Sequence, residues 1–105
     1  MNLPNVISNL LTAQNHFDSR AYADCFSEHS SVFDENEIFK GREEIKRWNG
    51  STNAKYQTQL EPVEYFANDH LLHVKVSGTF KGSPIILKYQ FEISDGQISR
   101  LRITS

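Results

Sequence analysis

The sequence has few of the residues that form disulfides, zinc sites or nucleic-acid interfaces. Its one cysteine, Cys25, has no partner for an internal disulfide and belongs to no CxxC pair or zinc-binding quartet. The net charge is only −2, from 11 basic and 13 acidic residues, which gives no basic surface for nucleic acid. We therefore expect a protein that does not bind nucleic acid.

Long apolar runs are also missing. The N-terminal segment MNLPNVISNLLTAQNHF has no basic region, and Asn and Ser interrupt its apolar residues. A signal peptide needs a continuous apolar region, and a membrane span needs about 20 apolar residues. We therefore expect a soluble cytoplasmic protein that does not interact with a membrane.

The chain does have enough apolar residues to form one hydrophobic core. Its 105 residues are typical of a single domain, which we expect to span residues 1–105. Hydrophobic residues make up 38% and aromatic residues 11% of the chain, a composition that excludes a disordered tail, a coiled coil or a collagen-like repeat.

Apolar spacing predicts two helices at the start of the chain. Residues from Leu3 to Phe17 recur at i, i+3, i+4 and i+7, and Pro4 is tolerated in the first turn. Either Asp18 or Ser19 then caps a second, short helix that ends near residues 27–29.

A third helix is predicted after a short extended segment over residues 31–34 and a loop over residues 35–40. It covers residues 42–49, because Asn49-Gly50-Ser51 is typical of a helix end. Its inward face carries Ile45 and Trp48.

From Tyr56 onward the apolar period changes to two, which predicts four antiparallel strands in a meander. Pro62 indicates a bulge or an edge position, and Asp95-Gly96 indicates a tight hairpin turn. Helices followed by strands favour an α+β fold, with three N-terminal helices packed on one face of a curved antiparallel sheet. The polar residues of the other face are predicted to be solvated or to form a homodimer contact: Lys75, Lys88, Gln90 and Glu92.

Two segments carry a resemblance to a known family: FSEHSSVFD over residues 26–34, and Gly41-x-x-x-Ile45-x-x-Trp48. With the order of elements along the whole chain, they resemble the nuclear transport factor 2-like (NTF2-like) superfamily, and within it the SnoaL-like and ketosteroid isomerase-like families. The resemblance implies a hollow cone and a homodimer formed through the sheet. Isomerases, cyclases, dehydratases and non-catalytic scaffolds all use this fold.

The resemblance implies that Asp34 occupies the place of a general base. Ketosteroid isomerases also place a Tyr and a protonated Asp where they stabilise the oxyanion. In this sequence the position of that Tyr is Leu10, and the position of that Asp falls near Leu87 or Lys88. Because both donors are missing, we do not expect a steroid isomerase of the standard kind.

Two interpretations of Asp34 remain open. A carboxylate facing an apolar cavity has a raised pKa and is a usable base near neutral pH. Alternatively, Asp34 caps or forms an ion pair within the loop at residues 35–41, close to Lys40 and Arg42. The neighbouring Glu35 and Glu37 are expected to lie in water.

Aromatic residues are the candidates for lining a pocket that takes a flat apolar ligand. For each of them singly, an ordinary place in the core is the alternative. The predicted substrate-binding residues are Tyr22, Phe26, Trp48, Tyr56 and Tyr89, with His16 at the mouth.

No metal site and no cofactor are predicted. His29 is expected to be solvated, while His70 and His73 fall on opposite faces of one strand because three residues is an odd spacing at period two. Cys25 is interpreted as a small hydrophobic residue.

Two functions follow as hypotheses. The first is an acid–base isomerase, cyclase or dehydratase that acts on a small apolar carbonyl compound, with Asp34 as the general base and no cofactor. The alternative is a non-catalytic ligand-binding module or a dimeric assembly module of the same fold.

Overall fold

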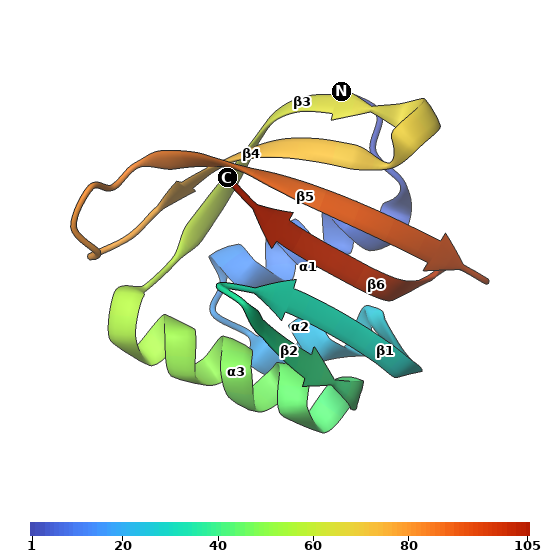
Figure 1. Ribbon diagram of the computed structural model, residues 1–105, viewed down its shortest axis with the longest axis horizontal. Coiled ribbons are helices and arrows are strands. Elements are labelled where there is room, and N and C mark those ends of the chain that lie inside the picture. Colours follow the sequence, from blue (N-terminus) through green and yellow to red (C-terminus); the bar gives the residue numbers. More distant parts are fainter.

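The computed structural model describes residues 1–105. Two helices, a pair of strands and a third helix make up the first half of the chain, and the other four strands follow in the second half (Figure 1). The elements are α1 (Asn5–Asn15), α2 (Ser19–Asp24), β1 (Phe26–Asp34), β2 (Glu37–Lys40), α3 (Gly41–Tyr56), β3 (Gln59–Phe66), the 3-10 turn η1 (Ala67–Asp69), β4 (Leu71–Ser77), β5 (Ile85–Ser94) and β6 (Gln97–Thr104).

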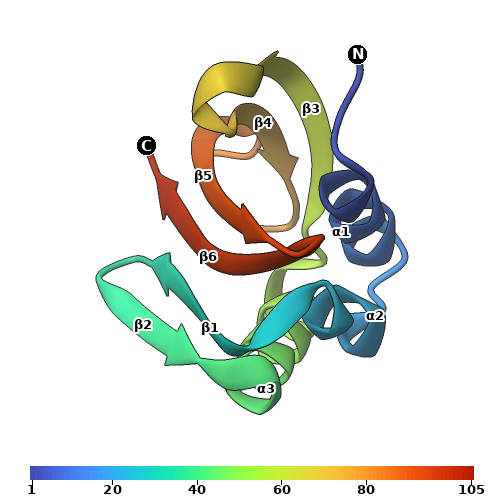
Figure 2. The ribbon, with the colours of Figure 1, turned by 90° about the vertical axis from the view of Figure 1, so that its right-hand side faces the viewer.

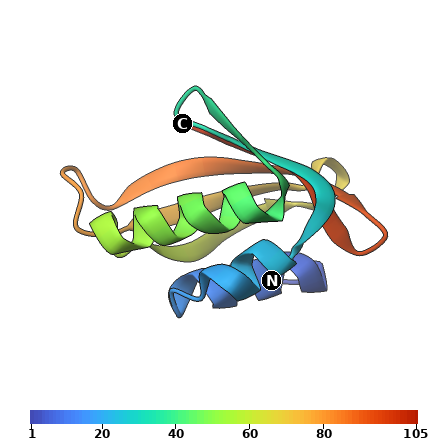
Figure 3. The ribbon, with the colours of Figure 1, turned by 90° about the horizontal axis from the view of Figure 1, so that it is seen from below.

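The strands form one six-stranded sheet in the order β2-β1-β6-β5-β4-β3. The sheet is curved, and the three helices lie on one side of it (Figures 2 and 3). This arrangement confirms the predicted α+β class with three helices packed on a curved sheet. The predicted four-strand meander is β3 to β6, all antiparallel. The sequence missed β2 and the parallel pairing of β1 with β6.

The core lies between the helices and the inner face of the sheet. Ile7 and Leu10 of α1 are fully buried against it. Along β4, Leu72, Val74 and Val76 are buried while Lys75 is exposed, as the period of two predicts. No helix is long and apolar enough to cross a membrane.

The predicted end of the second helix is wrong. Helix α2 begins with Asp18 as its cap, whose carboxylate accepts a hydrogen bond from the Ala21 N–H, but it ends at Asp24. Strand β1 starts at Phe26, which pairs with Ile98 of β6, and runs for 9 residues instead of covering only residues 31–34. The partner strand is 70 residues away in sequence, so local patterns carried no sign of it.

The predicted loop over residues 35–40 is also wrong. Strands β1 and β2 form a hairpin whose turn is Glu35-Asn36, with φ of 49° and 65°. Two consecutive positive φ values are typical of a tight hairpin turn that matches strand twist. The hairpin sets Asp34 at the last position of β1, opposite Glu37.

The third helix continues seven residues beyond the predicted end at Asn49 and reaches Tyr56. Asn49 and Asn53 are buried, and their side chains are hydrogen-bonded to each other and to Gln14 of α1. These tertiary contacts outweigh the weak helix propensity of the Asn49-Gly50-Ser51 segment. The helix ends at Gln57, which adopts the left-handed conformation.

The other predicted turns are confirmed. The register of β3 against β4 shifts between Pro62 and Glu64, which is the bulge that Pro62 indicated. Asp95 and Gly96 join β5 to β6 with φ of 52° and 74°.

Alanine in place of two glycines is expected to change the free energy of unfolding in opposite directions. A Cβ at Gly50, within α3, would lie 3.4 Å from the Ser19 Oγ, and we expect Gly50→Ala to raise the free energy of unfolding by up to ~1 kcal/mol. A Cβ at Gly78 would lie 2.5 Å from the Tyr56 carbonyl oxygen, so Gly78→Ala should lower it by about 1–3 kcal/mol. Urea denaturation measures both values, and a destabilised Gly50→Ala variant would contradict a helix that is continuous at this point.

Candidate functional site

A cavity of about 400 Å³ lies between the helices and the inner face of the sheet. Its volume is within the usual range for small-molecule sites. Apolar and aromatic side chains predominate, and a few polar groups interrupt them. The lining residues are Gln14, Tyr22, Asp34, Glu35, Trp48, Asn49, Thr52, Tyr56, Thr58, Val76, Phe80, Lys81, Ile85, Leu87, Tyr89 and Ile103.

Five of the seven predicted site residues line this one cavity. Tyr22 comes from α2, Asp34 from the end of β1, Trp48 and Tyr56 from α3, and Tyr89 from β5. Trp48 and Tyr56 are eight residues apart on a helix, so they share one face. The curvature of the sheet then brings β1 and β5 to the same space.

The other two predicted lining residues lie elsewhere. Phe26 is fully buried in the core, where its ring packs 5.6 Å from that of Tyr22. It starts β1 instead of ending a helix, and it is not among the residues that line the cavity. His16 is exposed at the end of α1, and its Nδ1 is 2.9 Å from the Thr12 carbonyl oxygen.

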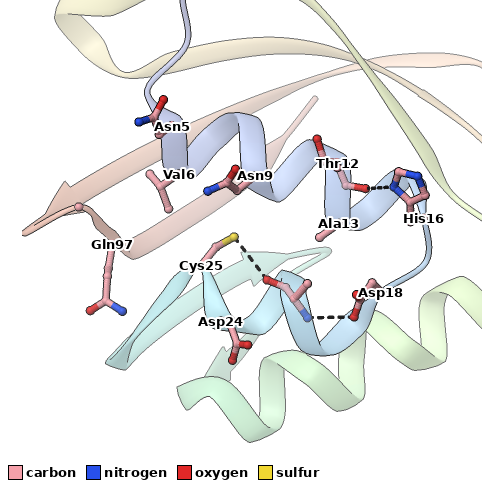
Figure 4. Close-up of a pocket in the computed structure, with 12 residues that line it drawn as sticks. Asn5, Val6, Asn9, Thr12, Ala13, His16, Asp18, Asp24, Cys25 and Gln97 are labelled. Atoms are coloured by element: carbon pink, nitrogen blue, oxygen red, sulfur yellow. Dashed lines mark hydrogen bonds between the residues drawn. The ribbon is translucent and has the colours of Figure 1, made fainter.

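His16 belongs to a separate surface groove of about 670 Å³ beside α1 and α2 (Figure 4). Most of its lining is polar, including Asn9 and Thr12. The thiol of Cys25 donates to the Ala21 carbonyl oxygen at 3.4 Å, and burial, with the nearby Asp24 charge, raises its pKa to about 11. The thiol is therefore protonated at neutral pH and is not a nucleophile.

Asp34 is partly buried, and its environment disfavours the charged carboxylate. Burial, with the charges of Glu35 and Glu37, raises its pKa to about 6, although a backbone hydrogen bond from Glu35 opposes this shift. Neither Lys40 nor Arg42 forms an ion pair with it: the ion pairs of the protein are Glu61 with Lys75 and Glu92 with Arg100. Within the cavity Asp34 is thus a stronger base than an exposed aspartate.

Tyr22 and Tyr89 are the two buried phenols of the cavity. Burial raises the pKa of both well above the usual value, and the negative charge of Asp34 raises each further. Both hydroxyls therefore stay protonated at neutral pH and are hydrogen-bond donors. The two side-chain oxygens that are fully buried without a hydrogen-bond partner belong to other residues, Ser30 and Tyr65.

Both N–H donors of the Gln14 amide, also in the cavity wall, already have partners. Its Nε2 donates to the Asn53 Oδ1 at 2.7 Å and to the Thr58 carbonyl oxygen at 2.8 Å, and its Oε1 accepts from the Asn49 Nδ2 at 2.7 Å. Neither Gln14 nor Asn49 was among the site residues predicted from the sequence. The feature of the sequence that could have indicated Gln14 is its position among the apolar residues on one face of α1.

The positions of the missing oxyanion donors provide no replacement. Leu10 is fully buried in the core and does not line the cavity. Leu87 does line it, but with an apolar side chain, and Lys88 is exposed. Tyr22 and Tyr89 are consequently the buried hydroxyl donors close to Asp34. No three His, Cys, Asp or Glu side chains are grouped so that they could hold a metal ion.

No protein-family model matches the chain, and neither does any curated protein. Solved structures do match. A proposed polyketide cyclase from Sinorhizobium meliloti is 34% identical over 97% of this chain and 95% of its own, with a TM-score of 0.90. A protein with a ketosteroid isomerase-like fold from Catenulispora acidiphila, solved in complex with trimethylamine, is 18% identical over 99% and 87%, with a TM-score of 0.86.

A third similar structure is that of SalBIII, an epoxide hydrolase/cyclase-like enzyme of pyran ring formation in the polyether salinomycin. It is 16% identical over 95% of this chain and 87% of its own, with a TM-score of 0.81. At this identity the likeness shows the fold alone. Together with the 34% identical relative, these structures show that the chain belongs to the NTF2-like superfamily, with its SnoaL-like and ketosteroid isomerase-like members.

The raised pKa of Asp34 predicts that the stability of the protein depends on pH. The pKa of this carboxyl in the folded protein is raised to about 6, whereas the ordinary value for an aspartate is 3.8. Ionisation therefore disfavours the fold, and stability falls as the pH rises through this interval. We expect Asp34→Asn to melt close to the parent protein at pH 4 and above it at pH 7.5.

Asp69→Asn is the control, because Asp69 is exposed in η1, and its difference from the parent should not change with pH. Thermal unfolding followed by circular dichroism measures all three proteins. A lower melting temperature for Asp34→Asn at pH 7.5 is the result expected if Asp34 is a structural cap. It would contradict the view that the ionised Asp34 carboxylate destabilises the folded protein.

Proposed function

We propose that this chain, as a single domain over residues 1–105, is a cofactor-free acid–base enzyme that acts on a small apolar carbonyl compound. The reaction is an isomerisation, cyclisation or dehydration, with Asp34 as the general base. The observation that supports this most is the shared cavity of Asp34, Tyr22 and Tyr89, in which the carboxylate has a raised pKa and the phenols stay protonated. The 34% identical relative is a proposed polyketide cyclase, which agrees with this class of reaction.

The proposed chemistry begins with proton transfer. Asp34 takes a proton from the carbon next to the carbonyl, and the electrons of that C–H bond move onto the carbonyl oxygen. The Tyr22 or Tyr89 hydroxyl donates a hydrogen bond to this oxygen as its negative charge develops. Return of the proton from Asp34 to another carbon gives an isomer. Attack of the enolate carbon on a second carbonyl carbon of the same molecule gives a ring, and the Asp34 proton passes to the oxygen of that carbonyl group. Departure of a β-hydroxyl together with the Asp34 proton, as water, gives a dehydrated product.

Trp48, Tyr56 and Tyr89 are proposed to hold the apolar part of the substrate, with Tyr22 beside the carbonyl group. Aromatic rings bind flat apolar molecules over a large contact area. His16 and Phe26 have no place in this proposal because they lie outside the cavity.

The second candidate is a non-catalytic ligand-binding module. The observation that favours it is the absence of oxyanion donors at Leu10, Leu87 and Lys88, together with a Gln14 amide that has no free N–H donor. In such a protein the same cavity binds the ligand without turning it over.

Alpha-proton exchange separates these two candidates without knowledge of the natural substrate. We expect the protein to accelerate exchange of the acidic protons of 2-tetralone, a flat cyclic ketone, in D₂O. Asp34→Asn should slow the catalysed exchange by about 10²–10⁴-fold, because it removes the general base. Tyr22→Phe combined with Tyr89→Phe should slow it by about 10²–10³-fold. Proton NMR measures the rates.

Asp69→Asn, outside the cavity, is the control and should exchange at the parent rate. Equal rates for the parent and Asp34→Asn would sink the enzymatic proposal. Binding of 2-tetralone with no accelerated exchange would favour the ligand-binding module.

We also propose that the protein is a cytoplasmic homodimer formed through the outer face of the sheet. This face carries Ile86, which is 54% exposed, opposite Lys75 of the neighbouring strand. An exposed isoleucine among Lys88, Gln90 and Glu92 matches the apolar centre and polar rim of an interface.

Sedimentation measures this association. We expect a dimer for the parent protein and a shift towards monomer for Ile86→Lys, because a charge would enter the apolar centre of the contact. Phe17→Lys, between α1 and α2 on the helix side of the sheet and 43% exposed, is the control and should sediment as the parent does. A parent protein that is monomeric at high concentration removes the dimer.

A further inference from the structure

A side pocket of about 190 Å³ adjoins the cavity, between α3 and the β1–β2 hairpin. The two spaces share five lining residues: Asp34, Glu35, Trp48, Thr52 and Tyr56. The side pocket adds Glu37, Phe39, Ser51 and Lys55. A ligand in the main cavity can therefore extend one small group past Asp34 into this side pocket.

Aromatic rings form part of its wall. The rings of Phe39 and Trp48 are stacked, with centroids 5.1 Å apart and an interplanar angle of 22°. Tyr56 lies on the same face of α3, two turns beyond Trp48. The faces of such rings are electron-rich and attract alkylammonium groups.

The position of one side chain shows that an ammonium group is accommodated here. The Nζ of Lys55 lies over the ring of Tyr56, 5.1 Å from its centroid. Lys55 lines the side pocket, is exposed and forms no ion pair. A flexible, solvated lysine can move aside for a ligand cation that offers the same charge together with more apolar surface.

The charge of the side pocket also favours a cation. Asp34, Glu35 and Glu37 contribute three carboxylates, against the single positive charge of Lys55. None of the three forms an ion pair within the protein. An anionic substituent would meet repulsion here, whereas a cation would compensate charges that are now solvated.

We infer that the side pocket binds a small alkylammonium group, so that the ligand of this protein carries a cationic amine beside its apolar part. For the enzyme, and resting on the proposed function, the substrate class is then an amino-substituted carbonyl compound whose ammonium group anchors it next to Asp34. Glu37 and Lys55 act on ligand affinity by their charge and do not touch the reacting atoms.

The test compares choline with 3,3-dimethyl-1-butanol, which has the same shape without the charge. Titration followed by amide NMR should show choline binding about tenfold more tightly, with the largest shifts at the Trp48 indole and along residues 51–56. Glu37→Gln should weaken choline binding about threefold, and Lys55→Gln should strengthen it about threefold. The affinity for choline relative to that for the neutral alcohol should therefore fall in Glu37→Gln and rise in Lys55→Gln.

Glu43→Gln is the control, because Glu43 is exposed in the first turn of α3 and lines neither pocket. Equal affinities for choline and the alcohol, or shifts confined to other surfaces, would overturn the inference. The exchange of 2-tetralone needs no ammonium group, so a failure here would leave that result standing, and choline binding in a protein without exchange activity would support an amine-binding module.

Discussion

Three buried amides join two of the three helices that line the cavity, α1 and α3. Gln14 of α1 donates to Asn53, Asn53 donates to Asn49, and Asn49 donates back to Gln14, with distances of 2.7, 3.1 and 2.7 Å. The ring is closed, so each side chain both donates and accepts. Buried amides are costly when unpaired, and a complete network therefore fixes one arrangement of α1 against α3. The second Gln14 proton extends this link to the Thr58 carbonyl oxygen, just before β3.

Much of the site depends on this link. It holds α3 as a helix past Gly50, and the residues carried on that extension include Thr52 and Tyr56, which line both the cavity and its side pocket. It also uses both N–H donors of the Gln14 amide in the cavity wall. The buried hydroxyl donors of the cavity are the phenols of Tyr22 and Tyr89, whose pKa values are raised by burial and by the Asp34 charge. Low local polarity thus makes the carboxylate a better base and keeps the phenols protonated.

The acidic side of the cavity depends on a different contact. Strand β1 pairs in parallel with β6, while its hairpin with β2 turns at Glu35-Asn36. Together these pairings set Asp34 where the cavity adjoins the side pocket and leave Glu35 and Glu37 near it. The side pocket is therefore negatively charged, and Phe39 and Trp48 form part of its wall. The proposed proton transfer takes place in the main cavity, and the inferred ammonium group binds in the side pocket.

The sequence by itself determined the α+β class, the meander from β3 to β6, the bulge at Pro62 and the turn at Asp95-Gly96, because period and turn chemistry are local properties. It also selected Asp34 and four aromatic residues that meet in one cavity, through a resemblance and through residue type. Only the tertiary structure decided the length of β1, the existence of β2 and the end of α3, since each depends on a partner distant in sequence. For the same reason it alone separated Tyr22, which faces the cavity, from Phe26, four residues later and enclosed in the core.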